Sequence, residues 1–444
     1  MRSHHSGAHA CLDTATGRGT LPTRRWFTFA ILIRVCLVIA LSRCLYLAAK
    51  QGISSWYLRQ DSLAALERAI QWDAANPQNF DDFGNLMHLF GDAGSPERIV
   101  QAYEAATRLS PQNAQYWADL GSAYDWSGRR DEALAAFHRA QQLFPNSPEI
   151  NWRVANFLIR TGKTTEGLEC LRKVLLSESI PRRDVFALAA RATHDNNEIL
   201  DRVVPARRAI LTDYLNFQIA KGDISAAEQV WQRLLALNIP FAIQEAFPYL
   251  DALIQHRKLA EVEQTRSLLA SRFPLETHSV PRDRSLVTNG SFEYDILNGG
   301  FDWRVAAVKG AHVSLDSENR WDGSRSLRID FDGTENPYYC HVFQYVLVQP
   351  ETHYRFSGYM RVEGITTDSG PLFEIYDAYD MQGFLVSTEA LVGTSEWSLR
   401  QVDFITRPNT RLLIVRVGRR PSQKFENQIA GTVWVDKVVL ETEN

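Results

Sequence analysis

Cysteine is scarce in this chain of 444 residues, and its five copies are widely separated. Two of them, Cys36 and Cys44, lie in an apolar segment near the N-terminus, and no pair has CxxC spacing. The pattern therefore indicates neither a zinc site nor a disulfide framework. An excess of charge is also missing, because the formal net charge is −4 and no long run of like charges occurs. This balance argues against a nucleic-acid partner.

Motifs of the common catalytic centres are missing as well. The sequence contains no HExxH motif, no phosphate-binding glycine loop and no recognisable Ser-His-Asp pattern. Glu374, Asp377 and Asp380 are closely spaced carboxylates of the kind that glycoside hydrolases use in pairs. Solvated carboxylates at strand edges are far commoner, so we expect a protein that is not an enzyme and keep a degenerate or accessory glycoside hydrolase as an alternative.

Residues 24–50 form the longest apolar segment, and 26–49 alone are enough to cross a bilayer as one helix. Arg34 lies near the middle, where an arginine costs about 2.5–3.5 kcal/mol on insertion scales. The surrounding Ile, Leu, Val and Phe residues offset this cost, and Arg43 is close enough to the far end to snorkel to the interface. We therefore predict a single transmembrane anchor, preceded by a disordered N-terminus over residues 1–23.

The orientation of the anchor follows from its basic flank. Arg24 and Arg25 precede the apolar segment, which places the N-terminus in the cytoplasm and the bulk of the chain outside it. A cleaved signal peptide and a buried helix of a soluble protein are the two alternatives.

Residues 114–147 show an internal repeat in which small, aromatic and turn residues stand at fixed positions. These positions are Trp117, Leu120, Gly121, Tyr124, Ala133, Phe137, Ala140 and Pro145. The segment resembles the tetratricopeptide repeat, a hairpin of two helices. Gly121 and Ala133 are small enough for the two helices to approach closely, and Gly128 stands at the turn, where a positive φ is expected.

The repeat continues on both sides with drift, and we predict roughly five helical hairpins over residues 55–273. Residues 177–205 contain several prolines and asparagines and are expected to be irregular. A stacked array of this type exposes a groove that holds a protein partner. Tyr116, Trp126 and Arg153 are candidates to line that groove, although Trp126 could instead cap its own hairpin.

Residues 274–285 are expected to be a linker. Over residues 286–444, the helical period gives way to an alternation of apolar and polar residues. Short alternating segments punctuated by Gly and Pro predict an antiparallel β-sandwich. The predicted fold class is thus multidomain α + β, with a transmembrane helix, a tetratricopeptide-type solenoid and a jelly-roll sandwich.

The order of motifs in this region adds a resemblance. An Asn-Gly-Ser-Phe-Glu segment at 289–293 opens the region, Trp303 and Gly323 follow, and Val435-Asp436 lies near its end. Residues 286–441 resemble carbohydrate-binding modules of the family 4 and 9 type within the galactose-binding-like group. The resemblance implies a structural Ca²⁺ between the first and last strands, with Glu293 and Asp436 as oxygen donors. Backbone N–H groups or Lys437 could satisfy these two carboxylates instead.

A carbohydrate site needs flat aromatic faces for the sugar ring and planar polar groups for its hydroxyls. The segments 336–345 and 373–380 supply both types of side chain. We predict a site that combines the following residues: Tyr338, Gln344, Glu374, Tyr376, Tyr379 and Arg416. Packing in the core is the competing interpretation for each aromatic residue.

Together these features predict a membrane-anchored binding protein whose helical array recruits a protein partner and whose sandwich binds a polysaccharide. A part in exopolysaccharide assembly or export fits this combination by fold-level analogy. A purely structural scaffold, in which the sandwich contacts protein, is the principal alternative.

Overall fold

The computed structural model of the protein describes residues 23–60, 62–90, 96–274 and 285–443. Almost all of the predicted N-terminal disordered segment and of the predicted linker therefore lie outside the described residues. The chain forms two compact units, residues 1–174 and 175–444. The second unit contains helices as well as the sandwich, and the two units are described in turn.

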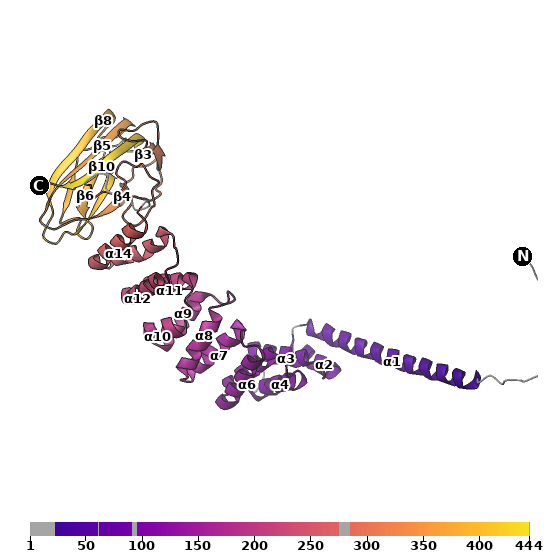
Figure 1. The fold of residues 1–444 in the computed structure, drawn as a ribbon. Helices are drawn as coiled ribbons and strands as arrows, with labels where there is room; N and C mark the ends of the chain where they lie inside the picture. The colour runs from indigo at the N-terminus through magenta and orange to yellow at the C-terminus, as the bar shows by residue number, and fades with distance from the viewer. Residues whose placement is uncertain (1–22, 61, 91–95, 275–284, 444) are drawn as a thin grey trace, which may run out of the picture. The chain divides into compact units, whose positions relative to one another are not determined.

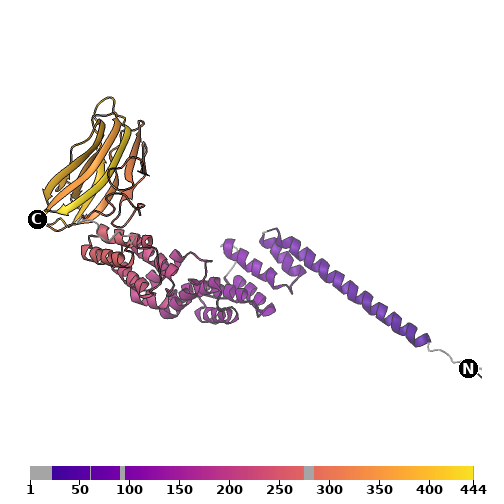
Figure 2. The same cartoon turned by 45° about the horizontal axis from the view of Figure 1, so that its top comes forward.

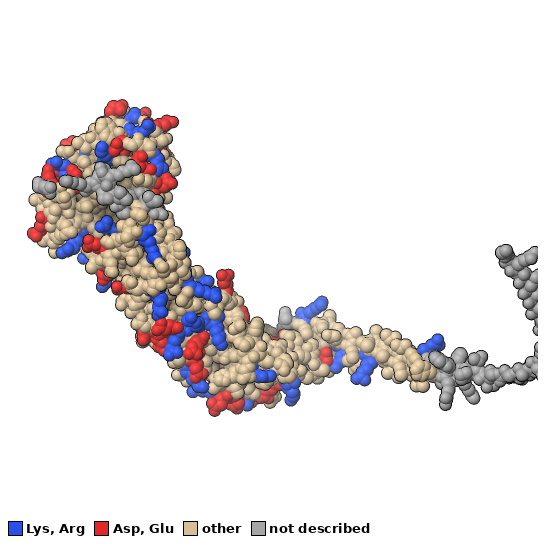
Figure 3. Space-filling view, in the orientation of Figure 1, with Lys and Arg blue, Asp and Glu red and all other residues tan. Residues whose placement is uncertain are grey.

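The first unit begins with α1 (Thr23–Leu58), a helix of 36 residues (Figure 1). Its stretch Ile31–Leu58 has a mean hydropathy of 2.1 and is long and apolar enough to cross a membrane. Side chains from residue 31 to residue 49 are exposed, and Figure 3 shows an almost uncharged surface along most of the helix. A signal sequence near the N-terminus passes the same test of length and composition.

The C-terminal end of α1 is held against the next helices. Ser54 is completely buried, and its hydroxyl accepts a 3.0 Å hydrogen bond from the side-chain amide of Asn79. Lys50 forms an ion pair with Asp73, just after α2 (Leu63–Trp72). These contacts begin where the exposed apolar stretch ends, at about residue 50.

Three helix pairs complete the first unit: α3 (Pro77–Phe90) with α4 (Pro96–Leu109), α5 (Ala114–Trp126) with α6 (Arg130–Leu143), and α7 (Pro148–Arg160) with α8 (Thr164–Val174). The predicted hairpin of residues 114–147 is confirmed. A Cβ at Gly121 would lie 2.8 Å from the ring of Phe137, which explains why glycine is needed there. Gly128 has a φ of 79° and makes the turn between α5 and α6.

Three further helix pairs open the second unit: α9 (Arg182–Ala192) with α10 (Asn196–Arg202), α11 (Arg208–Lys221) with α12 (Ile224–Ala236), and α13 (Phe247–Gln255) with α14 (Leu259–Arg272). A 3₁₀ turn, η1 (Ile243–Ala246), precedes α13. The prediction of irregular structure at 177–205 is wrong, because α9 and α10 lie between its prolines. Pro181 immediately precedes α9, and the side chain of Asp195 caps α10.

Ten strands follow (Figures 1 and 2). They are β1 (Arg304–Val305), β2 (Ala311–Asp316), β3 (Ser326–Asp332), β4 (Tyr339–Leu347), β5 (His353–Ile365), β6 (Leu372–Asp377), β7 (Leu385–Ser387), β8 (Gly393–Ile405), β9 (Leu412–Arg419) and β10 (Ala430–Thr442). One antiparallel sheet has the order β1-β4-β9-β6-β7, and the other has the order β2-β3-β10-β5-β8. The predicted antiparallel β-sandwich is confirmed.

The core of the sandwich lies between the two sheets. Alternate residues of β3 and β9, among them Ile329 and Val415, point into it and are fully buried. Gly290 in the opening motif allows the chain to cross β10 closely, because a Cβ there would lie 2.0 Å from the carbonyl oxygen of Val438. That motif therefore fastens the start of the sandwich to its last strand.

The last helix pair packs on the sandwich within the second unit. Asp251 of α13 forms a two-pronged ion pair with Arg304 of β1, with bonds of 3.0 and 2.5 Å. The ring of Phe247 lies against Gly299 and Gly300, where any larger residue would clash with it. The end of the helical array is thus covered by the sandwich, as the need to cap a solenoid requires.

Candidate functional site

Four of the six predicted carbohydrate-binding residues meet on the outer face of the sheet that contains β6 and β9. Glu374 of β6 stands directly opposite Arg416 of β9 in the strand register. Tyr376 follows two residues later on the same face of β6, and Tyr338 lies just before β4. We call Tyr338, Glu374, Tyr376 and Arg416 the Arg416 cluster.

Arg416 is the centre of this cluster because its guanidinium bonds to all three partners. It donates a 2.7 Å hydrogen bond from Nε to Glu374, a 3.2 Å bond to the hydroxyl of Tyr376 and a 2.5 Å bond to the hydroxyl of Tyr338. Its carbon Cζ also lies 4.7 Å and 5.4 Å from the centroids of the two tyrosine rings. Charge-assisted bonds and cation–π contacts thus fix the orientation of both rings.

Exposure differs sharply within the Arg416 cluster. Arg416 and Glu374 are only 5% and 2% exposed, whereas Tyr338 is 45% exposed. Burial raises the pKa of Tyr376, and the nearby Arg416 opposes that shift. The part of the cluster that a ligand can reach is therefore the ring of Tyr338, with the half-buried Tyr376 behind it.

Tyr379 and Gln344 are not part of this cluster. The hydroxyl of Tyr379 donates a 2.8 Å hydrogen bond to the backbone oxygen of Ile254 at the end of α13, and Arg257 lies 4.9 Å from its ring. Gln344 is completely buried, and its amide makes two 2.8 Å bonds with the backbone of Thr288. The prediction did not separate the outer face of the sheet from its inner face, so it grouped residues with different surroundings.

Phe425 is an exposed aromatic residue that the sequence prediction missed. It lies in the loop between β9 and β10 and is fully exposed. This loop is held beside Tyr338, because Asn336 and Ser422 exchange two 3.0 Å hydrogen bonds through the side-chain amide of Asn336. The one available signal was a lone aromatic residue in a polar run, Ser422 to Asn427.

The two predicted calcium ligands lie against one loop of the sandwich. Asp436 accepts hydrogen bonds of 2.7 and 2.9 Å from the backbone N–H groups of Trp321 and Asp322. Glu293 accepts a 2.7 Å bond from the backbone N–H of Ser324. Within the described residues, no group of three or more His, Cys, Asp or Glu is placed to hold a metal ion. Backbone amides thus satisfy both carboxylates, as the alternative interpretation expected, and bound calcium stays a prediction.

The three candidates on the helical array lie on the first helices of their hairpins. Tyr116 is 6% exposed, and its hydroxyl donates a 3.0 Å hydrogen bond to Gln78 of α3. Trp126 is 49% exposed, with its ring 5.5 Å from that of His88. It therefore contacts the preceding hairpin. Arg153 pairs with Asp119 of α5.

Comparison with known proteins supports the reading of the helical region. Residues 114–147 match the tetratricopeptide repeat family. This segment is a tetratricopeptide repeat. Over 154 residues, the chain is 25% identical to the formate-dependent nitrite reductase complex subunit NrfG of Escherichia coli O157:H7, covering 35% of this chain and 66% of that protein. Over 123 residues, it is 27% identical to the peroxisomal targeting signal receptor of Eremothecium gossypii, covering 24% of this chain and 22% of the receptor.

One solved structure resembles the helical region of this chain, and another resembles the sandwich. YrrB, described as a tetratricopeptide protein with an unusual peptide-binding site, matches 42% of this chain and 90% of its own, with 19% identity and a TM-score of 0.30. A CBM4 module matches 35% of this chain and 99% of its own, with 13% identity and a TM-score of 0.27.

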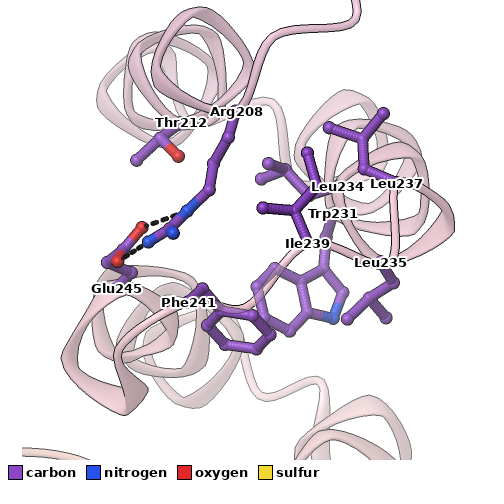
Figure 4. Close-up of a pocket in the computed structure, with 9 residues that line it drawn as sticks. All are labelled: Arg208, Thr212, Trp231, Leu234, Leu235, Leu237, Ile239, Phe241 and Glu245. Carbon is purple, nitrogen blue, oxygen red and sulfur yellow. Dashed lines mark hydrogen bonds and ion pairs between the residues drawn. The ribbon is translucent and has the colours of Figure 1, made fainter.

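Figure 4 shows a pocket on the helices of the second unit. Trp231 and Phe241 form one side of it, and the ion pair between Arg208 and Glu245 forms the other. Its cavity volume of about 20 Å³ is enough for a single water molecule. The candidate surfaces considered below are the Arg416 cluster and the tetratricopeptide-like hairpins of the first unit.

Proposed function

We propose that this protein is a non-catalytic binding protein, in which the tetratricopeptide array recruits a protein partner and the sandwich binds a polysaccharide. The observation that carries the second half is the fixed, half-exposed ring of Tyr338 in the Arg416 cluster. An aromatic ring held in one orientation offers a flat apolar face to a sugar without a further cost in side-chain entropy.

Tethering to a membrane is the third part of the proposal. It rests on the exposed apolar side chains of α1 between residues 31 and 49, which have no other described element to pack against. By the charge of its N-terminal flank, the bulk of the chain would lie outside the cytoplasm. A part in exopolysaccharide assembly or export follows by analogy from the combination of anchor, array and sandwich.

A structural scaffold is the second candidate function. It is favoured by the internal bonding of Arg416, whose donors are directed at Glu374 and two tyrosine hydroxyls. A guanidinium used in this way holds the sheet together and has little capacity left for sugar hydroxyls. The same ion pair weighs against the hydrolase alternative, because the carboxylate of Glu374 is buried beneath Arg416.

A glycan array probed with the full chain in detergent tests the proposal. Tyr338→Ala is expected to abolish binding of whichever glycan the wild-type protein retains. Trp321→Ala is the matched control, because Trp321 is 46% exposed and belongs to the other face of the sandwich, where it stacks on Tyr359. Wild-type protein that retains no glycan would favour the scaffold. Equal loss in both variants would show that the Arg416 cluster is not the site.

A further inference from the structure

Ion pairs join the first helices of successive hairpins in the first unit. Asp119 of α5 pairs with Arg153 of α7, 34 residues later, and Asp125 of α5 pairs with Arg160 of α7. In both pairs the acidic residue belongs to the earlier hairpin and the basic residue to the next one. Between α5 and α7, each acidic side chain of these two pairs is therefore neutralised by an arginine of the same protein.

The corresponding step between α3 and α5 has no such ion pair, because α5 contains no Lys or Arg, and Arg153 of α7, whose charge also acts on Asp81, is already paired with Asp119. Asp81 of α3 faces Asp119 of α5, so that a second carboxylate stands where the next step has an arginine. Asp81 is only 5% exposed. One of its carboxylate oxygens accepts a 3.1 Å bond from Asn85, and the other has no hydrogen-bond partner among the described residues. A buried carboxylate oxygen without a donor is costly to keep ionised.

The groups around Asp81 come from four helices. Asp82 and Asn85 lie on α3, Tyr103 lies on α4, and Asp119 and Arg153 lie on α5 and α7. The hydroxyl of Tyr103 donates a 2.8 Å bond to the side-chain oxygen of Asn85, which turns the amide nitrogen of Asn85 toward Asp81. Asn85 is itself exposed, so this group of side chains borders the surface.

We infer that Asp81, with Asp119 beside it, receives the Lys or Arg side chain of an extended segment of the protein partner. This inference rests on the proposed function of the array and names the chemistry of its partner. A basic side chain of the partner would donate a hydrogen bond to the carboxylate oxygen of Asp81 that has no donor in the described part of the chain. Arg153 does the same for Asp119 between α5 and α7. A divalent cation is a poorer match, because the described residues contain no group of three or more metal-ligating side chains.

Protonation of Asp81 gives the site a pH dependence. Burial, with help from the neighbouring Asp119 and Asp82, raises the pKa of Asp81 to about 7. A bound basic side chain favours the ionised carboxylate, so binding releases a proton from Asp81. Peptide affinity is therefore expected to be about tenfold higher at pH 8 than at pH 6, since about a tenth of Asp81 is ionised at the lower pH.

Selection from a random 12-residue peptide display library, with the full chain in detergent as the target, tests the inference. Wild-type protein should enrich peptides with a basic residue at one fixed position. Asp81→Asn should lose that enrichment. Glu97→Gln is the matched control, because Glu97 is an exposed carboxylate in the first turn of α4 and is not among the groups around Asp81. That variant should select the same peptides as the wild type.

A second measurement changes the peptide and can be read on the wild-type protein. Replacing the enriched Lys or Arg of one selected peptide with Gln should weaken binding to the wild-type protein at least tenfold, and should change little for Asp81→Asn. Selected peptides without a common basic residue, or a Gln peptide that binds as tightly, would overturn the inference alone. Failure to select any peptide would count against the proposed partner-binding function itself.

Discussion

Arg416 and Glu374 form an ion pair with 2.6 Å between Nη2 and Oε2, although their side chains are only 6% and 2% exposed. Two charges taken out of water are tolerated only where geometry and additional hydrogen bonds compensate for the lost hydration. Here the hydroxyls of Tyr338 and Tyr376 accept the remaining guanidinium bonds. The ion pair therefore fixes the two rings as well as joining β6 to β9.

The first prediction concerns that pair. Glu374→Ala leaves the charge of Arg416 buried without its counter-ion, which is expected to lower the free energy of unfolding by about 3–5 kcal/mol. The double variant Glu374→Ala with Arg416→Met removes both charges and should recover part of the loss. Urea unfolding measures both. A single variant within about 1 kcal/mol of the wild type would show that the pair is not a strong contributor.

The contact between Tyr379 and α13 leads to the second prediction. Tyr379→Phe removes the hydrogen bond to the backbone oxygen of Ile254 and leaves the ring in place. Loss of one such bond is expected to lower the free energy of unfolding by about 1 kcal/mol. It should also speed proteolysis at the junction of helices and sandwich. Unchanged glycan binding in this variant would agree with a position outside the Arg416 cluster.

Asp302 gives a third prediction, for pH dependence. It is 3% exposed, one of its carboxylate oxygens has no hydrogen-bond partner among the described residues, and burial raises its pKa to about 6. Its ordinary pKa is 3.8, so between about pH 4 and 6 the folded state holds more protons than the unfolded state. The contribution of Asp302 to stability is therefore highest at low pH and falls as the pH rises through this window.

Asp302→Asn removes that contribution. Across the window, the difference in unfolding free energy between variant and wild type should change by about 3 kcal/mol in favour of the variant as the pH rises. Denaturant unfolding at several pH values between 4 and 7 measures it. Asp436, whose pKa burial also raises to about 6, remains in both proteins and cancels in the comparison. A constant difference would contradict the prediction.

The fourth prediction is the calcium hypothesis. If Ca²⁺ binds beside Glu293 and Asp436, chelation should lower the melting temperature of the sandwich, and added Ca²⁺ should restore it. Asp436→Asn should then melt at the same temperature with and without the ion. A wild-type melting temperature that does not respond to Ca²⁺ would mean that the two carboxylates are stabilised without the ion, by the backbone amides of Trp321, Asp322 and Ser324.

A fifth prediction concerns α1. The full chain is expected to sediment with membranes and to resist extraction at alkaline pH. A variant that begins at Gln51 should be soluble, because it keeps Ser54 and its contacts while it loses the exposed apolar stretch. A tag placed before Arg24 distinguishes an anchor, which keeps the tag, from a cleaved signal peptide, which loses it.

Local patterns in the sequence determined the elements of this protein. The spacing of Gly121, Gly128 and Phe137 predicts a helical hairpin, because each residue type suits one place in it. Alternation after residue 286 predicts strands for a similar reason, since the period of two is a property of the strand itself. The helices α9 and α10 were missed because prolines and asparagines that mark their ends looked like breaks.

Only the tertiary structure decided which side chains share a surface. Nothing in the sequence separates Tyr376, which bonds to Arg416 on the neighbouring strand, from Tyr379, which bonds to a helix 125 residues earlier in the chain. Nor does it show that Arg153 pairs with Asp119 and leaves one carboxylate oxygen of Asp81 without a donor among the described residues, because these three residues come from different hairpins. Periodicity reports the face that a residue lies on, whereas contacts between distant segments depend on register and packing, which a single sequence does not contain.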